Sequence, residues 1–161
     1  PEKAEKVYLQ LLERVPDDVS VLNNLACLLA ETVNPPRPAQ ALIYSQRAYD
    51  LMRQKGVSIP LLMDTHGWVL TLAGHQQEGI LLLRETVDRS PFVDACYHLG
   101  EAYLKNNSPE LAAEPLRQAD QLLQKAKADK KPVDTALEAK IADALKRLAA
   151  ALDAKHQAAL P

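Results

Sequence analysis

Apolar residues recur every three or four positions along most of the chain, and this period predicts amphipathic helices. In one such stretch, Leu99, Ala102 and Tyr103 fall on a single helical face. Prolines, glycines and short polar runs interrupt the pattern and separate eight helices. We expect these helices at Glu2–Val15, Val19–Glu31, Pro38–Gln54, Pro60–Ala73, Gln76–Arg89, Val93–Asn106 and Pro109–Ala126, with the last one beginning at Thr135.

Short polar residues mark several of the expected helix starts. Asp18 is placed to cap the second helix, and Ser108 followed by Pro109 is a hydroxyl cap followed by a first-turn proline. Thr135 with Glu138 has the spacing of a capping box. The proline-rich turn at residues 34–38 is interpreted as a stiff spacer, because a ligand for an SH3 or WW domain needs a longer exposed run.

Small residues flank the expected turn within each helix pair, at a nearly constant spacing. Gly67 and Gly79 are twelve residues apart, and so are Gly100 and Ala112. Ala26 and Ala41 are fifteen apart, so three extra residues fall in the proline-rich turn. Small side chains at these positions allow two antiparallel helices to approach closely, which predicts three helical hairpins.

The order of residues around these small positions resembles the tetratricopeptide repeat (TPR) signature W-x2-L-G-x2-Y followed by A-x3-F and A. The clearest copy reads Cys96-x2-Leu99-Gly100-x2-Tyr103, then Ala112-x3-Leu116-x2-Ala119. Further copies are Met63-x2-His66-Gly67-x2-Leu70, Leu22-x2-Leu25-Ala26-x2-Leu29 and, for a second helix alone, Ala4-x3-Tyr8-x2-Leu11. The resemblance covers Glu2 to about Lys125 and implies an all-α, TPR-type solenoid of helical hairpins wound into a right-handed superhelix.

In this register the chain divides into repeats and a C-terminal extension. A half repeat occupies residues 1–16, repeats span about 19–54, 60–91 and 93–126, and residues 127–161 form a connector and a C-terminal capping helix. The capping helix carries an apolar stripe of Leu137, Ile141, Leu145, Leu148 and Leu152. A stripe of this kind covers the last hairpin of a solenoid or forms a dimer seam. Its shortness favours the cap and a monomer, and leaves a dimer through this helix as the alternative.

The resemblance also implies a binding surface, because the first helices of TPR hairpins commonly line a concave groove that holds a peptide. Side chains that leave the core stripe on these helices include Asn23, Cys27, Asp64, Trp68, Tyr97 and Glu101. Trp68 has two interpretations, an apolar anchor for a partner or a side chain buried against the neighbouring first helix. The carboxylate clamp of chaperone-binding TPR proteins is largely missing, since Cys27, Thr65 and His98 replace clamp residues. The acidic excess of this face favours a neutral or basic peptide.

The sequence offers little support for other functions. It contains no nucleophile elbow, P-loop or zinc-protease motif, so we expect no enzyme, cofactor or metal site. His66 replaces a core leucine and is expected to be a packed imidazole. Lysines and arginines are scattered at a net charge of −2, which does not indicate nucleic-acid binding. No apolar run of about 20 residues is present, so we expect no membrane insertion.

The predicted function is protein–protein interaction, a scaffold that binds a peptide or protein segment. Two alternatives stay open: an accessory segment of a larger enzyme or of a secretion or assembly machine, and a self-associating structural module. The chain opens inside a repeat, and we expect it to be cut from a longer protein. Cys27 and Cys96 form no disulfide framework, which favours a reducing, intracellular compartment, although the sequence names neither compartment, pathway nor partner.

Overall fold

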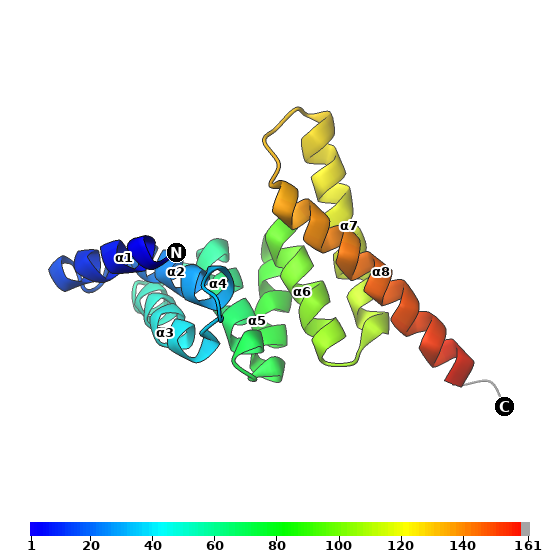
Figure 1. The fold of residues 1–161 in the computed structure, drawn as a ribbon, viewed down its shortest axis with the longest axis horizontal. Coiled ribbons are helices and arrows are strands. Elements are labelled where there is room, and N and C mark those ends of the chain that lie inside the picture. The colour runs from blue at the N-terminus through cyan, green and yellow to red at the C-terminus, as the bar shows by residue number, and fades with distance from the viewer. Residues whose placement is uncertain (159–161) are drawn as a thin grey trace. The chain divides into compact units, whose positions relative to one another are not determined.

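The structure is a computed structural model that describes residues 1–158, and within them it is all-α (Figure 1). Its elements are α1 (Glu2–Arg14), α2 (Val19–Cys27), η1 (Leu28–Thr32), α3 (Pro38–Gln54), α4 (Pro60–Leu72), α5 (Gln76–Arg89), α6 (Val93–Lys105), α7 (Pro109–Ala128) and α8 (Thr135–Ala158). The eight expected helices are therefore confirmed, with most of their ends within one residue. Pro115 lies inside α7 without ending it, because near the first turns a proline removes only one backbone hydrogen bond.

The second helix departs from the expected α-helix at its C-terminal end. From Leu28 it widens into a π-helix, η1, in which the Val33 N–H donates to the Leu28 carbonyl over 3.1 Å. The Arg37 N–H then donates to the Leu29 carbonyl over 2.7 Å, so the proline-rich turn folds back onto the widened helix. The extra residues of this turn are thus absorbed partly in the helix and partly in the loop. A single π-turn is too short to show a period of its own, so helical periodicity in the sequence does not reveal it.

The capping predictions met different outcomes. Asp18 caps α2 as expected, because its Oδ1 accepts from the N–H groups of Ser20 and Val21, both over 3.0 Å. The side-chain cap predicted at Ser108 is wrong: its hydroxyl makes no cap bond to α7 and donates backward to the Asn106 carbonyl over 3.3 Å.

The capping box predicted at Thr135 and Glu138 is also wrong. Asp134 caps α8 instead, with its Oδ1 accepting from the Ala136 N–H over 2.8 Å. Glu138 forms an ion pair with Lys127 of α7. A carboxylate at a helix N-terminus is favoured electrostatically over a hydroxyl, which explains the shift by one residue. The connector is shorter than predicted, because α7 continues to Ala128.

Helix contacts divide the chain into two compact units, residues 1–82 and residues 83–161, which we describe separately. In the first unit α2 packs on α3, and α3 on α4. The core between them is built from Leu25, Leu29, Ala41 and Val69, with Tyr8 and Leu12 of α1 against its edge. Gly79 meets Gly67 as expected, since a Cβ added at Gly79 would lie 2.6 Å from the Gly67 carbonyl oxygen.

In the second unit α6 packs along α7, and α8 lies on α7 and touches α6 (Figure 1). A Cβ added at Gly100 would lie 2.4 Å from Cγ of Leu116, so this hairpin too depends on a missing side chain. Within the apolar stripe of α8, Ile141 and Leu148 are buried, and the three other leucines are half-buried. The stripe thus packs against other helices of the same chain. This burial favours the interpretation as a cap over the interpretation as a dimer seam.

His66 is a buried imidazole, as predicted, with 3% of its surface exposed. Its Nδ1 lies 3.0 Å from Oγ of Ser45, and its ring stacks on Tyr49 at a centroid distance of 4.9 Å. Burial lowers the pKa of His66 from 6.5 to about 4, because the charged form loses its hydration, and the carboxylates of Asp50 and Glu78 oppose this only in part. The neutral imidazole is therefore a packing element of α4 against α3.

We expect Gly100→Ala to destabilise the protein by about 1–3 kcal/mol, even though alanine is the better helix former. The added Cβ would collide with Leu116, whose side chain fills the space over the glycine. Urea unfolding measures the cost. A double variant with Leu116→Ala removes the colliding atoms and should lose less stability than the two single variants together. If the destabilisations of the two single variants add exactly in the double variant, Leu116 does not contact residue 100.

We expect acid to destabilise the protein through His66 between pH 6.5 and 4. In the unfolded chain the imidazole binds a proton below its ordinary pKa of 6.5, whereas the folded chain binds it only below about 4. The unfolded state gains protons first as the pH falls. The free energy of unfolding therefore has its full value at neutral pH and falls by about 3 kcal/mol by pH 4. Urea unfolding of the wild type and His66→Phe at several pH values isolates it. Parallel pH profiles of the two proteins would contradict the assignment.

Candidate functional site

The six predicted site residues divide between the two units. Asn23, Cys27, Asp64 and Trp68 lie in the first, and Tyr97 and Glu101 lie in the second. Cys27 is half-buried, whereas the other five are buried, with exposed fractions from 2% for Asp64 to 7% for Trp68 and Tyr97. Five of the six side chains are therefore covered by the chain itself, and the part of all six in binding a partner stays a prediction.

In the first unit the structure brings the side chains of two first helices into contact. The indole N–H of Trp68 on α4 donates to Oε1 of Glu31 on η1 over 3.0 Å. One turn away, Sγ of Cys27 lies 3.5 Å from Oγ1 of Thr65. Of the two interpretations of Trp68, this is burial against the neighbouring first helix. Glu31 itself is exposed, so its carboxylate is held in place by the tryptophan while it faces water.

Cys27 is a poor nucleophile in this setting. Burial raises the pKa of its thiol. The hydrogen bond to Thr65 opposes this in part, and the charges of Glu31 and Asp64 add smaller increases. The thiol therefore stays protonated at neutral pH. Neither Cys27 nor Cys96 is part of a disulfide.

In the second unit Glu101 is consumed by an ion pair with the last helix. Its side chain is 6% exposed and accepts from the Arg147 guanidinium, whose second nitrogen lies 3.4 Å from Oε2. Arg147 also donates to Asp143 over 2.8 Å. The hydrogen bond to Glu101 raises the pKa of Arg147, so the pair stays charged. Arg147 lies outside the apolar stripe of the last helix, and no local signal in the sequence links it to a residue 46 positions away.

The residue that follows each small crossing residue has the same role in all three hairpins. Cys27 follows Ala26, Trp68 follows Gly67, and Glu101 follows Gly100. A helix turns about 100° per residue, so the residue after the crossing points sideways, away from its own hairpin partner. Cys27 and Trp68 each contact the neighbouring first helix of the first unit, and Glu101 contacts the terminal helix α8 of the second.

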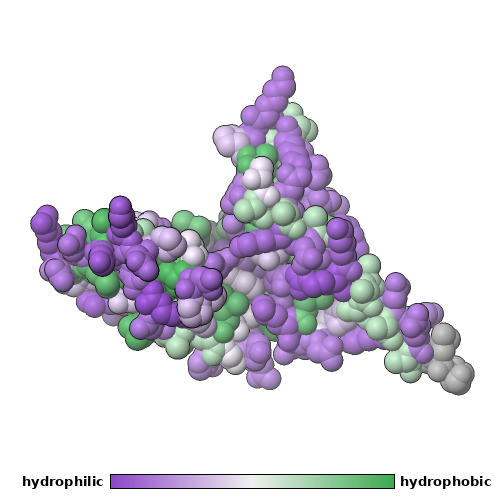
Figure 2. Space-filling view, in the orientation of Figure 1, coloured by the Kyte–Doolittle hydropathy of each residue, from purple (hydrophilic) through white to green (hydrophobic). Residues whose placement is uncertain are grey.

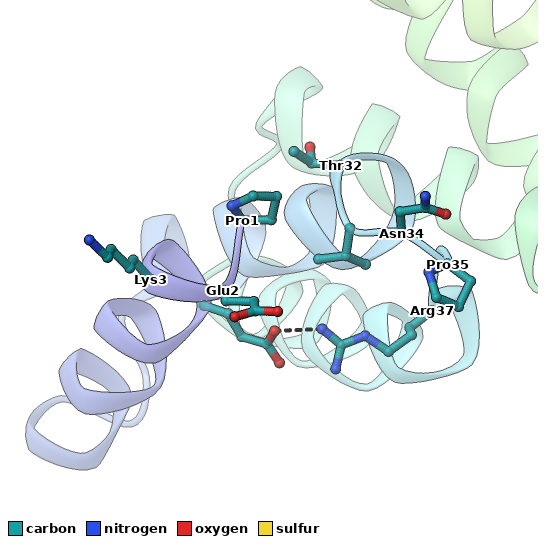
Figure 3. A pocket seen from close by; sticks show the side chains of 9 residues that line it. Pro1, Glu2, Lys3, Thr32, Asn34, Pro35 and Arg37 are labelled. Atoms are coloured by element: carbon teal, nitrogen blue, oxygen red, sulfur yellow. Dashed lines mark hydrogen bonds and ion pairs between the residues drawn. The ribbon is translucent and has the colours of Figure 1, made fainter.

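The first unit also has a surface cavity of about 560 Å³, between the start of α1 and the turn after η1 (Figure 3). Glu5 and Arg37 form an ion pair across its floor at 2.5 Å, and Arg37 also donates to Gln40 over 3.1 Å. Hydrogen bonding to Arg37 lowers the pKa of Glu5. Lys3 points away from this pair in Figure 3. No histidine, cysteine or serine lines the cavity.

Residues 1–158 contain neither a metal-binding cluster nor a membrane-spanning helix. No group of three or more histidine, cysteine, aspartate or glutamate side chains is placed to hold a metal ion there. None of the helices in this range is long and apolar enough to cross a membrane. Comparison with known proteins adds no further guide, because no family model and no curated protein matches the chain.

We expect Arg147→Met to destabilise the protein by about 1–3 kcal/mol, between the values for exposed and buried ion pairs, because Arg147 is half exposed and Glu101 is not. The cost comes from a buried carboxylate left without its cation. Adding Glu101→Gln removes that charge and should recover stability in denaturant unfolding. Asp143→Asn, which breaks only the exposed contact of Arg147, serves as the control and should be nearly neutral. Equal losses for Arg147→Met and Asp143→Asn would contradict this account.

Proposed function

We propose that the chain is a protein–protein interaction module, a TPR-type solenoid whose first helices bind a peptide or protein segment. The observation that carries the proposal is the sideways contact repeated after each crossing residue. In the first unit it ties two first helices edge to edge, α2 with η1 to α4, through Cys27 with Thr65 and Trp68 with Glu31. Successive first helices held side by side would form one continuous face, as the sequence resemblance to TPR proteins implies.

The buried side chains of this face would hold other residues in position, and its exposed side chains would contact the partner. Trp68 is covered but fixes the exposed carboxylate of Glu31. Asn24 on α2 is exposed as well and lies off the core stripe. The exposed carboxylate of Glu31 favours a neutral or basic segment. A carboxylate already held by a hydrogen bond loses little side-chain entropy when a partner binds.

A catalytic function has less support than binding. The imidazole of His66 is buried and stays neutral, and the thiol of Cys27 stays protonated. In the second unit, the buried carboxylate of Glu101 is already paired with the guanidinium of Arg147 from the same chain. None of these groups combines access to a substrate with a pKa suited to proton transfer at neutral pH.

The test begins with the full chain as bait and mass spectrometry of the captured proteins, followed by calorimetric titration of an identified partner. We expect Glu31→Lys to weaken binding by about tenfold or more, that is by about 1.4 kcal/mol, because it reverses the accessible charge. Trp68→Phe keeps an aromatic ring and removes the N–H that holds Glu31, and it should weaken binding by a smaller factor.

The matched control is Glu114→Lys, which reverses an equally accessible charge on α7, a second helix. Its affinity for the partner should equal that of the wild type. Circular dichroism melts of all variants separate loss of binding from loss of fold. If Glu31→Lys binds as tightly as Glu114→Lys, the first-helix face is not the binding surface.

A further inference from the structure

The second unit has a surface notch of about 290 Å³ between the end of α7 and the turn that leads into α6. Phe92 and Val93 line it from this turn and the start of α6, and Leu122 and Ala126 line it from the last turns of α7. All four are half-buried, so part of their apolar surface faces solvent. We call this cavity the α7 notch.

The first unit links the corresponding edge with an ion pair. Counted from the small crossing residues, Pro91 takes the place of Asp17. Gln118 of α7 likewise takes the place of Arg47 of α3. Asp17 and Arg47 form an ion pair at 2.7 Å, which links the turn before α2 to α3. Proline and glutamine cannot form such a pair, so no ionic link of this kind joins the turn before α6 to α7.

Lysines surround the α7 notch, and two of them are unmatched within residues 1–158. Lys125 lines the notch from α7, and Lys130 follows the end of this helix. Both are exposed, and neither forms an ion pair within the described residues. Figure 2 shows mainly hydrophilic residues at this end of α7. The mouth of the notch therefore carries positive charge that the described part of the chain does not neutralise.

The carboxylates of this region are already engaged within the chain. The contacts are Lys127 with Glu138, Lys131 with Asp129 over 3.6 Å, and Asp134 with the first turn of α8. Asp94, which follows Val93 in the sequence, does not line the notch. Among the lining residues, Asp129 is the one carboxylate, against the two lysines Lys125 and Lys131. The balance of charge at the notch favours an acidic ligand.

The backbone at the end of α7 leaves these lysines available. The Lys131 N–H donates to the Ala126 carbonyl over 2.9 Å, and the Lys130 N–H donates to the Lys127 carbonyl over 3.0 Å. Lysine side chains can bind the last carbonyls of a helix and complement its dipole, but here backbone groups already bind these carbonyls. Lys130 has a φ of +54°, a conformation that favours glycine, so a charged side chain stands where glycine would fold more easily.

We propose that the α7 notch binds a short acidic segment of a separate protein, which places one large apolar side chain in the notch and carboxylates beside Lys125 and Lys130. Pockets for whole small molecules measure about 300–1,000 Å³, so a notch of about 290 Å³ suits a single side chain better. An apolar centre with a polar rim is also the usual arrangement of a protein–protein contact.

Other occupants fit the α7 notch less well. Single-stranded nucleic acid needs exposed aromatic rings on which its bases stack, and Phe92 is half-buried. A second copy that met the notch through the same face would bring the lysines of both copies together. The inference does not rest on the proposed function, because Glu31 and Trp68, which carry that proposal, lie in the first unit.

The experiment uses the full chain as the receptor and a labelled peptide as the probe. The probe has one phenylalanine followed by a short run of glutamates, within a glycine–serine sequence. One matched probe has alanine in place of the phenylalanine, and another has lysines in place of the glutamates. Fluorescence anisotropy measures the binding of each probe. We expect saturable binding of the first probe alone, and weaker binding in high salt, because exposed charges are screened.

Three variants test the charges around the notch. Lys125→Glu should weaken binding by about tenfold or more, because it places a carboxylate beside those of the probe. Lys146→Glu is the matched control, since it reverses an exposed lysine of α8 outside the notch, and it should leave binding unchanged. Lys130→Gly should weaken binding without lowering the melting temperature, because glycine adopts a positive φ readily.

A fourth variant, Ala126→Leu, tests the notch itself. Its larger side chain would extend into the cavity and should prevent binding while every lysine stays in place. Alanine and leucine are both good helix formers, so α7 should remain intact, which circular dichroism checks.

Four results would overturn the proposal. The first is no binding of the probe up to about millimolar concentration, with a wild-type chain that is folded by circular dichroism. The second is an equal loss of binding in Lys125→Glu and Lys146→Glu, or unchanged binding in Ala126→Leu, either of which would mean charge attraction outside the notch. The third is tighter binding of a short oligothymidylate than of the probe, which would assign the surface to nucleic acid. The fourth is a wild-type dimer in sedimentation that Ala126→Leu converts to a monomer, which would assign the notch to a second copy.

Discussion

The close approach of paired helices at residues without large side chains is the constraint on which the structure depends. Gly100 leaves the space that Leu116 fills, and Gly79 comes within contact of the Gly67 backbone. Because the two helices of a hairpin meet at one residue, the rotation of each helix about its axis is set. The direction of every other side chain follows from that rotation at about 100° per residue. A single small residue therefore determines which side chains face the partner helix, which face the neighbouring hairpin and which face water.

The residues next to these crossings show how the same constraint distributes polar groups. Trp68 and Glu101 come directly after a crossing glycine, and both are turned sideways into the contact with a neighbouring helix. A buried ion pair contributes little net stability, since desolvation offsets its attraction, but it discriminates against wrong registers. Glu101 with Arg147 can form only if α8 lies on α6 in one register. Apolar side chains would hold α8 as firmly, with less control over where it sits.

The parts of the structure that depend on local pattern could be predicted from the sequence. Helix ends followed from proline and glycine, the crossing glycines from their spacing, and the buried His66 from its place in the apolar stripe. The contacts that depend on distant partners could not. Arg147 has the composition of a solvated helix face, and only the packing of α8 brings it to Glu101. Asp134 took the cap predicted for Thr135 because two adjacent residues can both cap, and the stronger acceptor was favoured.

Exposure, taken alone, is a poor guide to the role of a residue in a fold built from repeated hairpins. Leu11 and Ala119 occupy the same position in their helices, yet Leu11 is 42% exposed and Ala119 is fully buried. The difference lies in what covers each helix and not in the residue. Conversely, Trp68 is an aromatic residue off the core stripe, and in an isolated helix it would suggest a surface anchor. It is buried because η1 lies beside α4. A residue in such a chain therefore contributes to the fold through the neighbouring helix that its position assigns to it.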